Sequence, residues 1–360
     1  MKKIIAITLV VLMLLSTLVG CSNTQEYPKF DYTFYGVFDT IIQIVGYTET
    51  KEEFDTYMAK IEERFGELHK LYDRFNNYEG INNIKTINDN AGKEAVKVEK
   101  EIIDLIIFSK ELYNKTGNLT NIAMGSVTDI WTYFMNEGIN NPENAQLPSM
   151  DILEEAKMHT DMDKIIVNEE ESTVYLEDPD MLLDVGAVAK GYATELIAQE
   201  MEEMGFVSAL ISSGGNIRAI GKPLDNLRDK WGVGIQNPDT SLFDSGRVLE
   251  TVFVTDASVV SSGDYQRYYY VGDKAYHHLV HPETLMPTNY YKQVSIVTPD
   301  SGAADFYSTA LFILPFEESK KLADSIEDFE AMWVFSDGTI EVTEGMKEVM
   351  LSYGATGAKK

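Results

Sequence analysis

The sequence predicts an α+β protein in which helices pack against mixed or antiparallel sheets. In the first half of the chain, helical spacing of apolar residues dominates. One face of a long helix is marked by residues three or four positions apart: Phe54, Met58, Ile61, Phe65, Leu68 and Leu71. In the second half, short strand-like runs separated by turns outnumber helical patterns. This uneven distribution favours an α+β arrangement over a doubly wound parallel fold.

The remaining elements follow from local composition. Residues 32–46 are rich in β-branched and aromatic side chains and predict a strand, whereas the Asn-rich residues 73–88 predict a loop. Further helices are predicted over 97–115, 189–204 and 301–314. Further strands are predicted over 164–167, 173–176, 181–183 and 207–212, with later turns at 263–264 and 272–273.

The N-terminus has the layout of an export signal. Basic residues 1–3 precede an apolar run over 4–19 that is short for a membrane span. The residues Leu18-Val-Gly-Cys21 resemble the lipobox of bacterial lipoproteins, which implies cleavage before Cys21 and a diacylglyceryl group on its sulfur. The alternative is an unprocessed apolar N-terminus with a chance cysteine. Because Cys21 is the only cysteine, a disulfide within the chain is excluded.

Acidic residues outnumber basic ones by 58 to 30, and the formal net charge is −28. This composition argues against a nucleic-acid partner, since nucleic-acid binding depends on clustered Lys and Arg and no basic block stands out. The same charge repels anionic lipids, so we expect a lipid tether rather than the protein surface to hold the chain at a membrane. An anionic ligand must be bound by local donors or a metal, because the overall field opposes it.

The segment 184–195 predicts a turn that leads into a helix. Gly186 and Gly191 let backbone approach a ligand closely, and the first turn of the helix offers free N–H groups. Asp184 and Lys190 lie beside this turn with opposite charges. The layout suits a phosphate-bearing ligand; the alternative is an ordinary strand–turn–helix with a surface Asp and Lys.

Two later segments also carry small and polar residues. Consecutive glycines in Ser212-Ser-Gly-Gly-Asn216 can expose amides as an anion-binding nest, or can form a plain hairpin. The histidines His277, His278 and His281 invite a metal interpretation, but on an extended chain alternate residues face opposite ways and no Cys completes a zinc site. We therefore expect a catalytic or ligand-contact role for His278 rather than a histidine metal site.

Asp305 and Thr309 lie one turn apart on a predicted helix, so their oxygens share one face. An acid and a hydroxyl in this arrangement can hold a hard cation such as Mg²⁺. The alternative is an Asp that interacts with the helix N-terminus while Thr309 only packs.

Taken together, five ordered motifs resemble those of the ApbE-type flavin transferases, which are bacterial FAD:protein FMN transferases. They are Asp184-Val-Gly-Ala-Val-Ala-Lys-Gly-Tyr-Ala193, Ser213-Gly-Gly-Asn216, Ser262-Gly-Asp-Tyr265, His278-Leu-Val-His-Pro-Glu-Thr284 and Ala304-Asp-Phe-Tyr-Ser-Thr-Ala-Leu311. Each motif is weak alone, and their order is what makes the resemblance specific. It covers essentially the whole chain after the tether.

The resemblance implies an ApbE-like (T-fold-like) architecture and a division of the chain. The implied parts are a lipoprotein signal over 1–20, the lipidated Cys21 and a tether over 21–30, a flavin transferase domain over 31–352, and a tail over 353–360. We accordingly expect an exported protein anchored by lipid to the extracytoplasmic face of the cell membrane.

The resemblance also implies an activity: Mg²⁺-dependent transfer of FMN from FAD to a Thr or Ser hydroxyl of an exported acceptor protein, with release of AMP. The implied metal ligands are the backbone carbonyl of Ala187 with Asp305 and Thr309, and Ser308 is adjacent. His278 matches the histidine that helps to deprotonate the acceptor hydroxyl. The implied FAD contacts are Tyr35, Tyr78, Trp131, Thr132, Tyr133, Asp184, Lys190 and Val280.

Flat rings could stack on aromatic side chains such as Tyr78 and Trp131. Two rival functions stay open at this point: a Mg²⁺-dependent FAD pyrophosphatase giving FMN and AMP, and a non-catalytic flavin-binding surface lipoprotein.

The chain departs from the family pattern in places. His281 and Asn121 stand where the family often has Asp, and Ser126 stands near a frequent Pro; we expect structural changes there. Acceptor sites in this family commonly end in Gly-Ala-Thr, and the chain's own tail contains Gly354-Ala-Thr356 after Tyr353, where a small residue is usual. Self-modification of Thr356 is therefore a hypothesis, with chance as its alternative.

Overall fold

The computed structural model describes residues 27–240, 246–265 and 267–359. The predicted signal over residues 1–20 and the lipidated Cys21 lie outside the described residues. Within the described ranges, no helix combines the length and the apolar character needed to cross a membrane.

An eight-stranded sheet forms the centre of the molecule, and every strand pairing in it is antiparallel. The α+β prediction is therefore confirmed. In spatial order the strands are β1 (Lys29–Val37), β2 (Thr40–Tyr47), β6 (Ser208–Ser213), β7 (Asn216–Gly221), β10 (Ser258–Gly263), β13 (Tyr291–Thr298), β14 (Glu330–Phe335) and β15 (Ile340–Val342).

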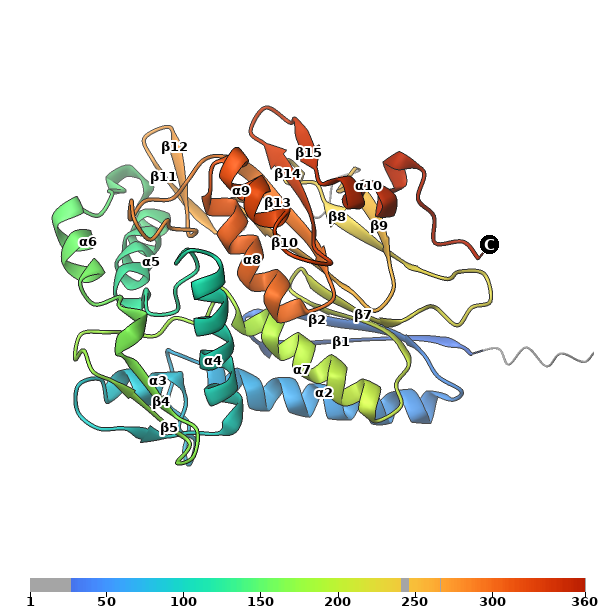
Figure 1. The fold of residues 1–360 in the computed structure, drawn as a ribbon, viewed down its shortest axis with the longest axis horizontal. Helices are drawn as coiled ribbons and strands as arrows, with labels where there is room; N and C mark the ends of the chain where they lie inside the picture. The colour runs from blue at the N-terminus through green and yellow to red at the C-terminus, as the bar shows by residue number, and fades with distance from the viewer. Residues whose placement is uncertain (1–26, 241–245, 266, 360) are drawn as a thin grey trace, which may run out of the picture.

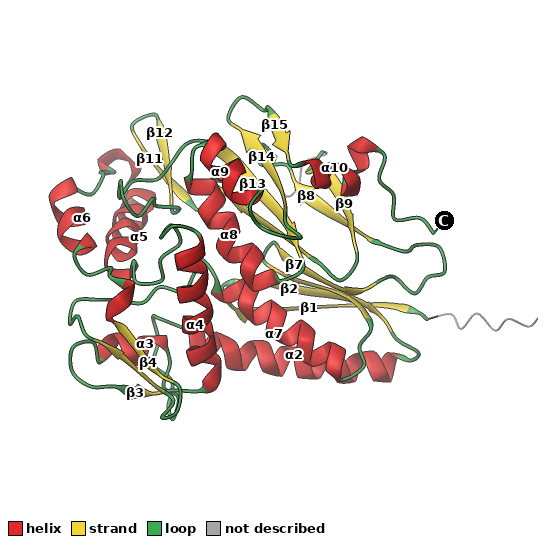
Figure 2. Ribbon diagram, in the orientation of Figure 1, coloured by secondary structure: helices red, strands yellow, loops and turns green. Residues whose placement is uncertain are grey.

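Helices cover one face of this sheet, and a two-stranded ribbon covers the other (Figures 1 and 2). The covering helices are α2 (Lys51–Tyr72), α7 (Ala189–Glu203) and α8 (Ser301–Ile313). The ribbon consists of β8 (Trp231–Gln236) and β9 (Val248–Val254), and its apolar side chains pack against Ala219, Val259 and Val297. The face beneath the helices also carries the polar motifs identified from the sequence.

The first half of the chain contributes most of the smaller elements, which lie to one side of the sheet in Figure 1. They are α3 (Ile84–Asp89), β3 (Val96–Lys97), α4 (Lys100–Lys115), α5 (Gly125–Asn140), α6 (Met150–Lys157), β4 (Ile165–Asn168) and β5 (Thr173–Leu176). The second half adds the hairpin β11 (Tyr268–Val271) and β12 (Lys274–His277), then α9 (Phe316–Ala323) and α10 (Glu344–Val349).

The predicted amphipathic helix is confirmed as α2. Its N-cap is Thr50, whose side chain accepts a hydrogen bond from the amide of Glu53, and all six predicted core positions are buried. Fully burying each of its large apolar side chains contributes roughly 1.5–3 kcal/mol. Packing against the sheet, more than intrinsic propensity, therefore stabilises this helix.

Three element predictions need correction. Residues 32–46 form a hairpin rather than one strand, because Phe38 and Asp39 take left-handed backbone angles (φ 51° and 50°) at a tight turn. Residues 181–183 are not a strand: Leu182 makes only an isolated bridge to Met124. Helix α3 interrupts the predicted loop 73–88, and its capping box begins at Asn83.

The predicted C-terminal tail packs against the domain. The carbonyl of Gly357 accepts the amide of Asp229 at 2.8 Å, and the amide of Lys359 donates to the carbonyl of Leu227 at 2.8 Å. Thr356 is exposed, and its hydroxyl oxygen accepts the amide of Ala358. Self-modification of Thr356 stays a prediction.

Candidate active site

Helices α7 and α8 meet at the glycine-rich turn. The amide of Gly191 in α7 donates to Oδ2 of Asp305 in α8 at 2.9 Å. A Cβ on Gly191 would lie 2.2 Å from the carbonyl oxygen of Ser301, so only glycine permits this contact. The turn that begins at Asp184 and the helix that carries Asp305 therefore lie side by side, as Figure 1 shows.

A buried ion pair fixes the same two helices to the sheet. Nε of Arg218 in β7 lies 3.0 Å from Oε2 of Glu195 in α7. That oxygen also accepts the amide of Ser301, at the start of α8, at 2.9 Å. Sequence reasoning missed this pair, because no pattern in the chain links positions 195 and 218.

Asp305 is only 6% exposed. Burial raises the pKa of its carboxyl, and the positive charge of Lys190 and the Gly191 amide oppose that shift without cancelling it. A carboxylate in these surroundings lacks full compensation for its charge. Binding of a cation there would favour the ionised form and release the proton.

Hydroxyl groups lie near Asp305 on α8 and on the neighbouring strand β10. Oγ of Ser308 donates to the backbone carbonyl of Asp305 at 2.8 Å and lies 2.7 Å from Oγ of Ser262 in β10. Thr309 follows Asp305 by one helical turn, so the two share a face of α8. Oxygen-rich surroundings of this kind suit Mg²⁺ better than softer metals.

The turn between β6 and β7 is a tight hairpin. Ser213 pairs with Asn216, and Gly214 and Gly215 between them have φ of +57° and +99°. The amide of Gly214 donates to the carbonyl of Ile41, so this amide does not form the predicted anion nest. Instead, the unpartnered groups are side chains: Oγ of Ser213 and Nδ2 of Asn216 are buried without a hydrogen-bond partner.

The amide of Asn216 lies near Asp305. A hydrogen-bond interaction from Asn216 lowers the pKa of that carboxyl, and its influence is smaller than those of burial, Lys190 and Gly191. Nδ2 nevertheless forms no hydrogen bond of ordinary length and angle. The donor therefore points into the site without a partner of its own.

Donors from three segments surround Asp184. Oδ2 accepts from Thr128 Oγ1 at 2.7 Å and pairs with Arg74 at 2.5 Å, while Oδ1 accepts the Gly186 amide at 3.0 Å. Burial alone would raise the pKa of Asp184, but the charge of Arg74 and these hydrogen bonds outweigh it and lower the pKa. Arg74 also pairs with Asp129. Sequence reasoning missed Arg74 because it stands in a segment predicted as a polar loop.

Two of the three neighbouring histidines serve local structure. Nε2 of the buried His277 donates to the carbonyl of Thr288, and its Nδ1 accepts the amide of Leu279 at 3.1 Å. Nδ1 of His281 accepts the amide of Glu283 at 3.0 Å. An Asp at position 281 could accept the same amide in an Asx turn, which accounts for that departure from the family pattern.

His278 differs from both. Its Nδ1 lies 3.3 Å from the carbonyl of Arg267. A carbonyl only accepts, so Nδ1 carries the hydrogen and Nε2 is left as an acceptor. Part of the residue reaches solvent, yet the protein packed around it lowers the pKa of His278 to about 4, and the charge of Lys190 adds to this effect. Lys190 therefore lies within electrostatic reach of both His278 and Asp305.

The implied aromatic contacts of the first half lie in different environments. Tyr35 on β1 is 69% exposed, and Thr40 at the start of β2 lies against Gly214 of the β6–β7 turn. Tyr78 donates to Oδ2 of Asp73 at 2.7 Å, and burial together with this bond raises the pKa of Tyr78 to about 12. Tyr35 thus lies on a hairpin that adjoins the site.

The three FAD contacts implied for helix α5 lie on two different faces of the helix. Trp131 is 2% exposed and donates to the carbonyl of Leu285 at 2.9 Å, so its ring belongs to the core and is not free to stack on a ligand. Thr132 and Tyr133 are exposed. They follow Thr128 and Asp129 by one turn and share their face of the helix, which is the face that meets Arg74 and Asp184.

The other departures are structural. Oδ1 of Asn121 accepts the amide of Ala123 at 2.7 Å, and Ser126 donates to the carbonyl of Ala156 at 3.0 Å. Val280 makes an isolated bridge to Pro287 in the loop after His278. These contacts shape the loops beside the site.

Two other features of the described residues resemble binding sites. Ligand atoms of His159, Asp178 and Asp180 lie within 4.8 Å of one another. However, His159 and Lys164 already pair with Asp178, and although burial opposes it, these contacts lower the pKa of Asp178 to about 2. This group is therefore an ion-pair network that joins the β4–β5 hairpin to the loop after α6.

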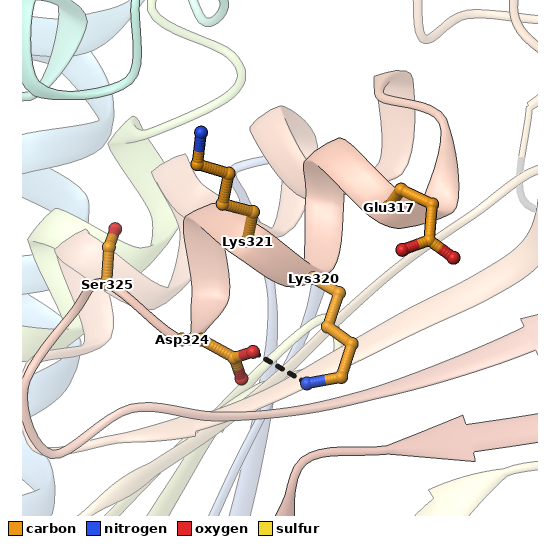
Figure 3. Close-up of a pocket in the computed structure, with 5 residues that line it drawn as sticks. All are labelled: Glu317, Lys320, Lys321, Asp324 and Ser325. Atoms are coloured by element: carbon orange, nitrogen blue, oxygen red, sulfur yellow. Dashed lines mark hydrogen bonds and ion pairs between the residues drawn. The ribbon is translucent and has the colours of Figure 1, made fainter.

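A hollow of about 400 Å³ lies on α9 (Figure 3). Charged side chains line it, including the ion pair between Lys320 and Asp324, and they come from the single segment 317–325. None of the residues of the α7–α8 site contributes to it. The hollow therefore carries no functional argument.

Comparison with known proteins gives a consistent result. The profile of the ApbE family matches residues 38–333. An FAD:protein FMN transferase of Treponema pallidum (strain Nichols) is 30% identical over 275 residues, which cover 73% of each chain. One of Klebsiella pneumoniae (strain 342) is 28% identical over 252 residues, covering 70% of this chain and 74% of the relative.

Solved structures share the fold. The ApbE protein of Thermotoga maritima superposes with a TM-score of 0.77 at 24% identity, covering 89% of this chain and 99% of the other. The apo form of the flavinyl transferase ApbE from Pseudomonas stutzeri gives a TM-score of 0.75 at 18% identity, with 92% and 98% covered.

Proposed function

The chain belongs to the ApbE family, and from that premise we propose that it is an FAD:protein FMN transferase, the activity in the names of its relatives. One observation carries the proposal beyond family membership. Lys190 lies within electrostatic reach of both Asp305 and His278, and the β6–β7 hairpin beside Asp305 carries two buried donors without partners. This combination suits the diphosphate of a dinucleotide.

The residues present fit a hard divalent cation. We propose that Asp305, Thr309 and the backbone carbonyl of Ala187 hold Mg²⁺, with the Ser308 hydroxyl next to them. Burial raises the pKa of the Asp305 carboxyl, and a bound cation would compensate the charge of its ionised form. This supports the choice of Asp305 as a ligand. Held by these residues, Mg²⁺ would supply positive charge that offsets the negative charge building up in phosphoryl transfer.

Other residues would bind and orient FAD. The exposed Thr132 and Tyr133 on α5, and Tyr35 on the adjoining hairpin, are available to contact it. Asp184 is kept ionised by Arg74 and can accept hydrogen bonds. Lys190 supplies positive charge, and Tyr78 and Val280 complete the proposed set. For Trp131 we propose a role in positioning α5, since its ring is in the core.

His278 is proposed to take the proton of the acceptor hydroxyl. The hydroxyl oxygen of a Thr or Ser would form a bond to the FMN-side phosphorus, and AMP would leave with the bridging oxygen. With Nδ1–H directed at the Arg267 carbonyl, Nε2 is the atom that accepts the proton. A pKa of about 4 keeps the ring neutral, and the negative charge of a bound diphosphate would raise it toward the range of a useful base.

The acceptor and the location complete the proposal. The acceptor would be an exported protein with a Gly-Ala-Thr-type site. Lipid on Cys21 would hold the enzyme at the extracytoplasmic face of the membrane, where such a protein is accessible.

Intact-mass spectrometry tests this function. A candidate Gly-Ala-Thr acceptor, incubated with enzyme, FAD and Mg²⁺, should gain one FMN group, and its Thr→Ala variant should not. Release of free FMN without labelling would instead indicate a pyrophosphatase. Tight FAD binding without any turnover in excess Mg²⁺ would indicate a flavin-binding lipoprotein.

A further inference from the structure

The two unpartnered donors at the β6–β7 hairpin lie on the face of the sheet that the helices cover. Ser213 is 0% exposed and Asn216 is 3% exposed, and the two residues pair across the hairpin. Residues two positions apart on a strand point to the same face of the sheet. Ile211, two positions before Ser213, belongs to the helix-covered core, and Arg218, two positions after Asn216, binds Glu195 of α7. Both side chains therefore point toward α7 and α8.

Such donors are unusual in a folded protein. Most buried polar groups have a hydrogen-bond partner, and an unpaired one destabilises the fold. The amide nitrogen of Asn216 only donates, and it cannot ligate a cation. The partner that is missing must therefore be an acceptor. The neighbouring Asp305 carboxylate is close enough for Asn216 to lower its pKa, but the two groups do not form a hydrogen bond of ordinary length and angle.

We propose that Ser213 and Asn216 form an uncharged subsite that donates hydrogen bonds to a non-bridging oxygen of the FAD diphosphate. This inference rests on the proposed function and assigns it two further substrate-binding residues. Arg218, the cation on the same strand face, is already paired with Glu195 and so does not compensate a bound phosphate. The protein is strongly acidic, so its overall field opposes the binding of an anion. Neutral donors on Ser213 and Asn216, next to the cation proposed at Asp305, would stabilise the diphosphate locally.

The test uses Asn216→Leu and Ser213→Ala, with Ser261→Ala as the matched control. Ser261 lies in the same sheet, but it alternates with Val260 and Ser262 and points to the opposite face, where its hydroxyl bonds Ser295 at 2.8 Å. FAD binding is followed by flavin fluorescence after rapid mixing in Mg²⁺, without acceptor protein. Binding of Mn²⁺ alone is followed by electron paramagnetic resonance, and thermal stability by calorimetry.

We expect Asn216→Leu and Ser213→Ala to weaken FAD binding by about 10- to 100-fold each, the effect of losing a hydrogen bond to a charged group. Binding of Mn²⁺ alone should stay unchanged. The Tm should not fall, since neither group loses a bond present in the free protein. Ser261→Ala should leave FAD binding unchanged.

Unchanged FAD affinity in both variants would overturn the subsite while leaving the proposed function intact. A Tm that falls together with affinity would also overturn it, because it would show that the two groups act through the fold. Wild-type protein that binds no FAD at all would remove the proposed function itself, and the subsite with it.

Discussion

Two aspartates at the proposed site lie in opposite surroundings. Asp184 is surrounded by donors from Arg74, Thr128 and Gly186, and its pKa is lowered. The Asp305 carboxylate accepts a hydrogen bond from the Gly191 amide, and burial raises its pKa. The protein compensates the charge of Asp184 with its own groups, whereas it compensates the charge of Asp305 only in part, as expected of the cation ligand that we propose.

This difference separates a framework from a binding site. The Arg74–Asp184 network joins the loop after α2 to α5 and the glycine turn, and it needs no ligand to be stable. Near Asp305, by contrast, the β6–β7 hairpin carries donors without partners, and the pKa of the carboxyl is raised. We infer that substitution of Arg74 acts mainly on stability, and substitution of Asp305 mainly on chemistry.

The largest expected effect is that of Asp305→Asn. Turnover should fall by about 10³-fold or more, because the metal contribution to transition-state stabilisation is several kcal/mol. The fold should persist, since an amide is easier to bury than a carboxylate. Mass spectrometry of the acceptor measures the activity and calorimetry the fold; activity within tenfold of wild type would show that the metal assignment is wrong.

Arg74→Met should have the largest effect on stability. The Arg74 side chain is 9% exposed, and its partners Asp184 and Asp129 are 23% and 45% exposed. Because these pairs are only partly buried, removing the guanidinium should lower the free energy of unfolding by about 2–3 kcal/mol, less than the cost of breaking a fully buried pair. Arg228→Met is the control, because the Arg228 side chain is 39% exposed and its ion pair with Asp225 should contribute about 1 kcal/mol or less. Urea unfolding measures both, and equal losses would contradict the framework interpretation.

The pH dependence of stability should differ in sign between the two aspartates. Asp305 has a folded pKa above its ordinary 3.8, so in metal-free protein its contribution to stability falls as pH rises from that value through the folded pKa. Asp184 has a folded pKa below 3.8, so its contribution is present above that value and is lost as pH falls through the folded pKa.

Asp305→Asn and Asp184→Asn remove these contributions one at a time. Unfolding free energies measured against pH, relative to wild type, should therefore change in opposite directions, by about 1.4 kcal/mol for each unit of pKa shift removed. Parallel slopes in the two variants would show that the two environments are not distinct.

The smallest effects concern α5. Trp131→Phe should cost about 1–3 kcal/mol, from a lost hydrogen bond and a small cavity, without a change in FAD affinity. Tyr133→Ala should leave stability within about 0.5 kcal/mol of wild type and weaken FAD binding. Titration with FAD and urea unfolding separate the two; an FAD defect limited to Trp131→Phe would restore the stacking role for that ring.

The sequence predicted much of this arrangement. Periodicity was sufficient for α2, α7 and α8, because each buries an apolar face against the sheet. Periodicity failed at residues 32–46, where the chain turns through left-handed backbone angles at Phe38 and Asp39. Neither residue type signals such a turn in the sequence. Periodicity failed also at 181–183, where an apolar extended segment is buried without joining a sheet.

Within the site, the ordered motifs identified Asp184, Lys190 and Asp305, and the structure brings Lys190 and Asp305 together. The partners of these residues were not predictable, since Arg74 and Thr128 reach Asp184 only through the tertiary fold. The placement of Trp131 in the core shows the same limit, because the face of a helix that an aromatic residue occupies depends on what packs against it.

The central claim is that a divalent cation binds at Asp305, between the glycine turn and α8. Anomalous scattering from crystals grown with FAD and Mn²⁺ tests it most directly. The account predicts a manganese peak at a bonding distance of roughly 2.0–2.3 Å from the Asp305 carboxylate, next to the diphosphate. A peak at His159 and Asp178 instead, with none at Asp305, would contradict it.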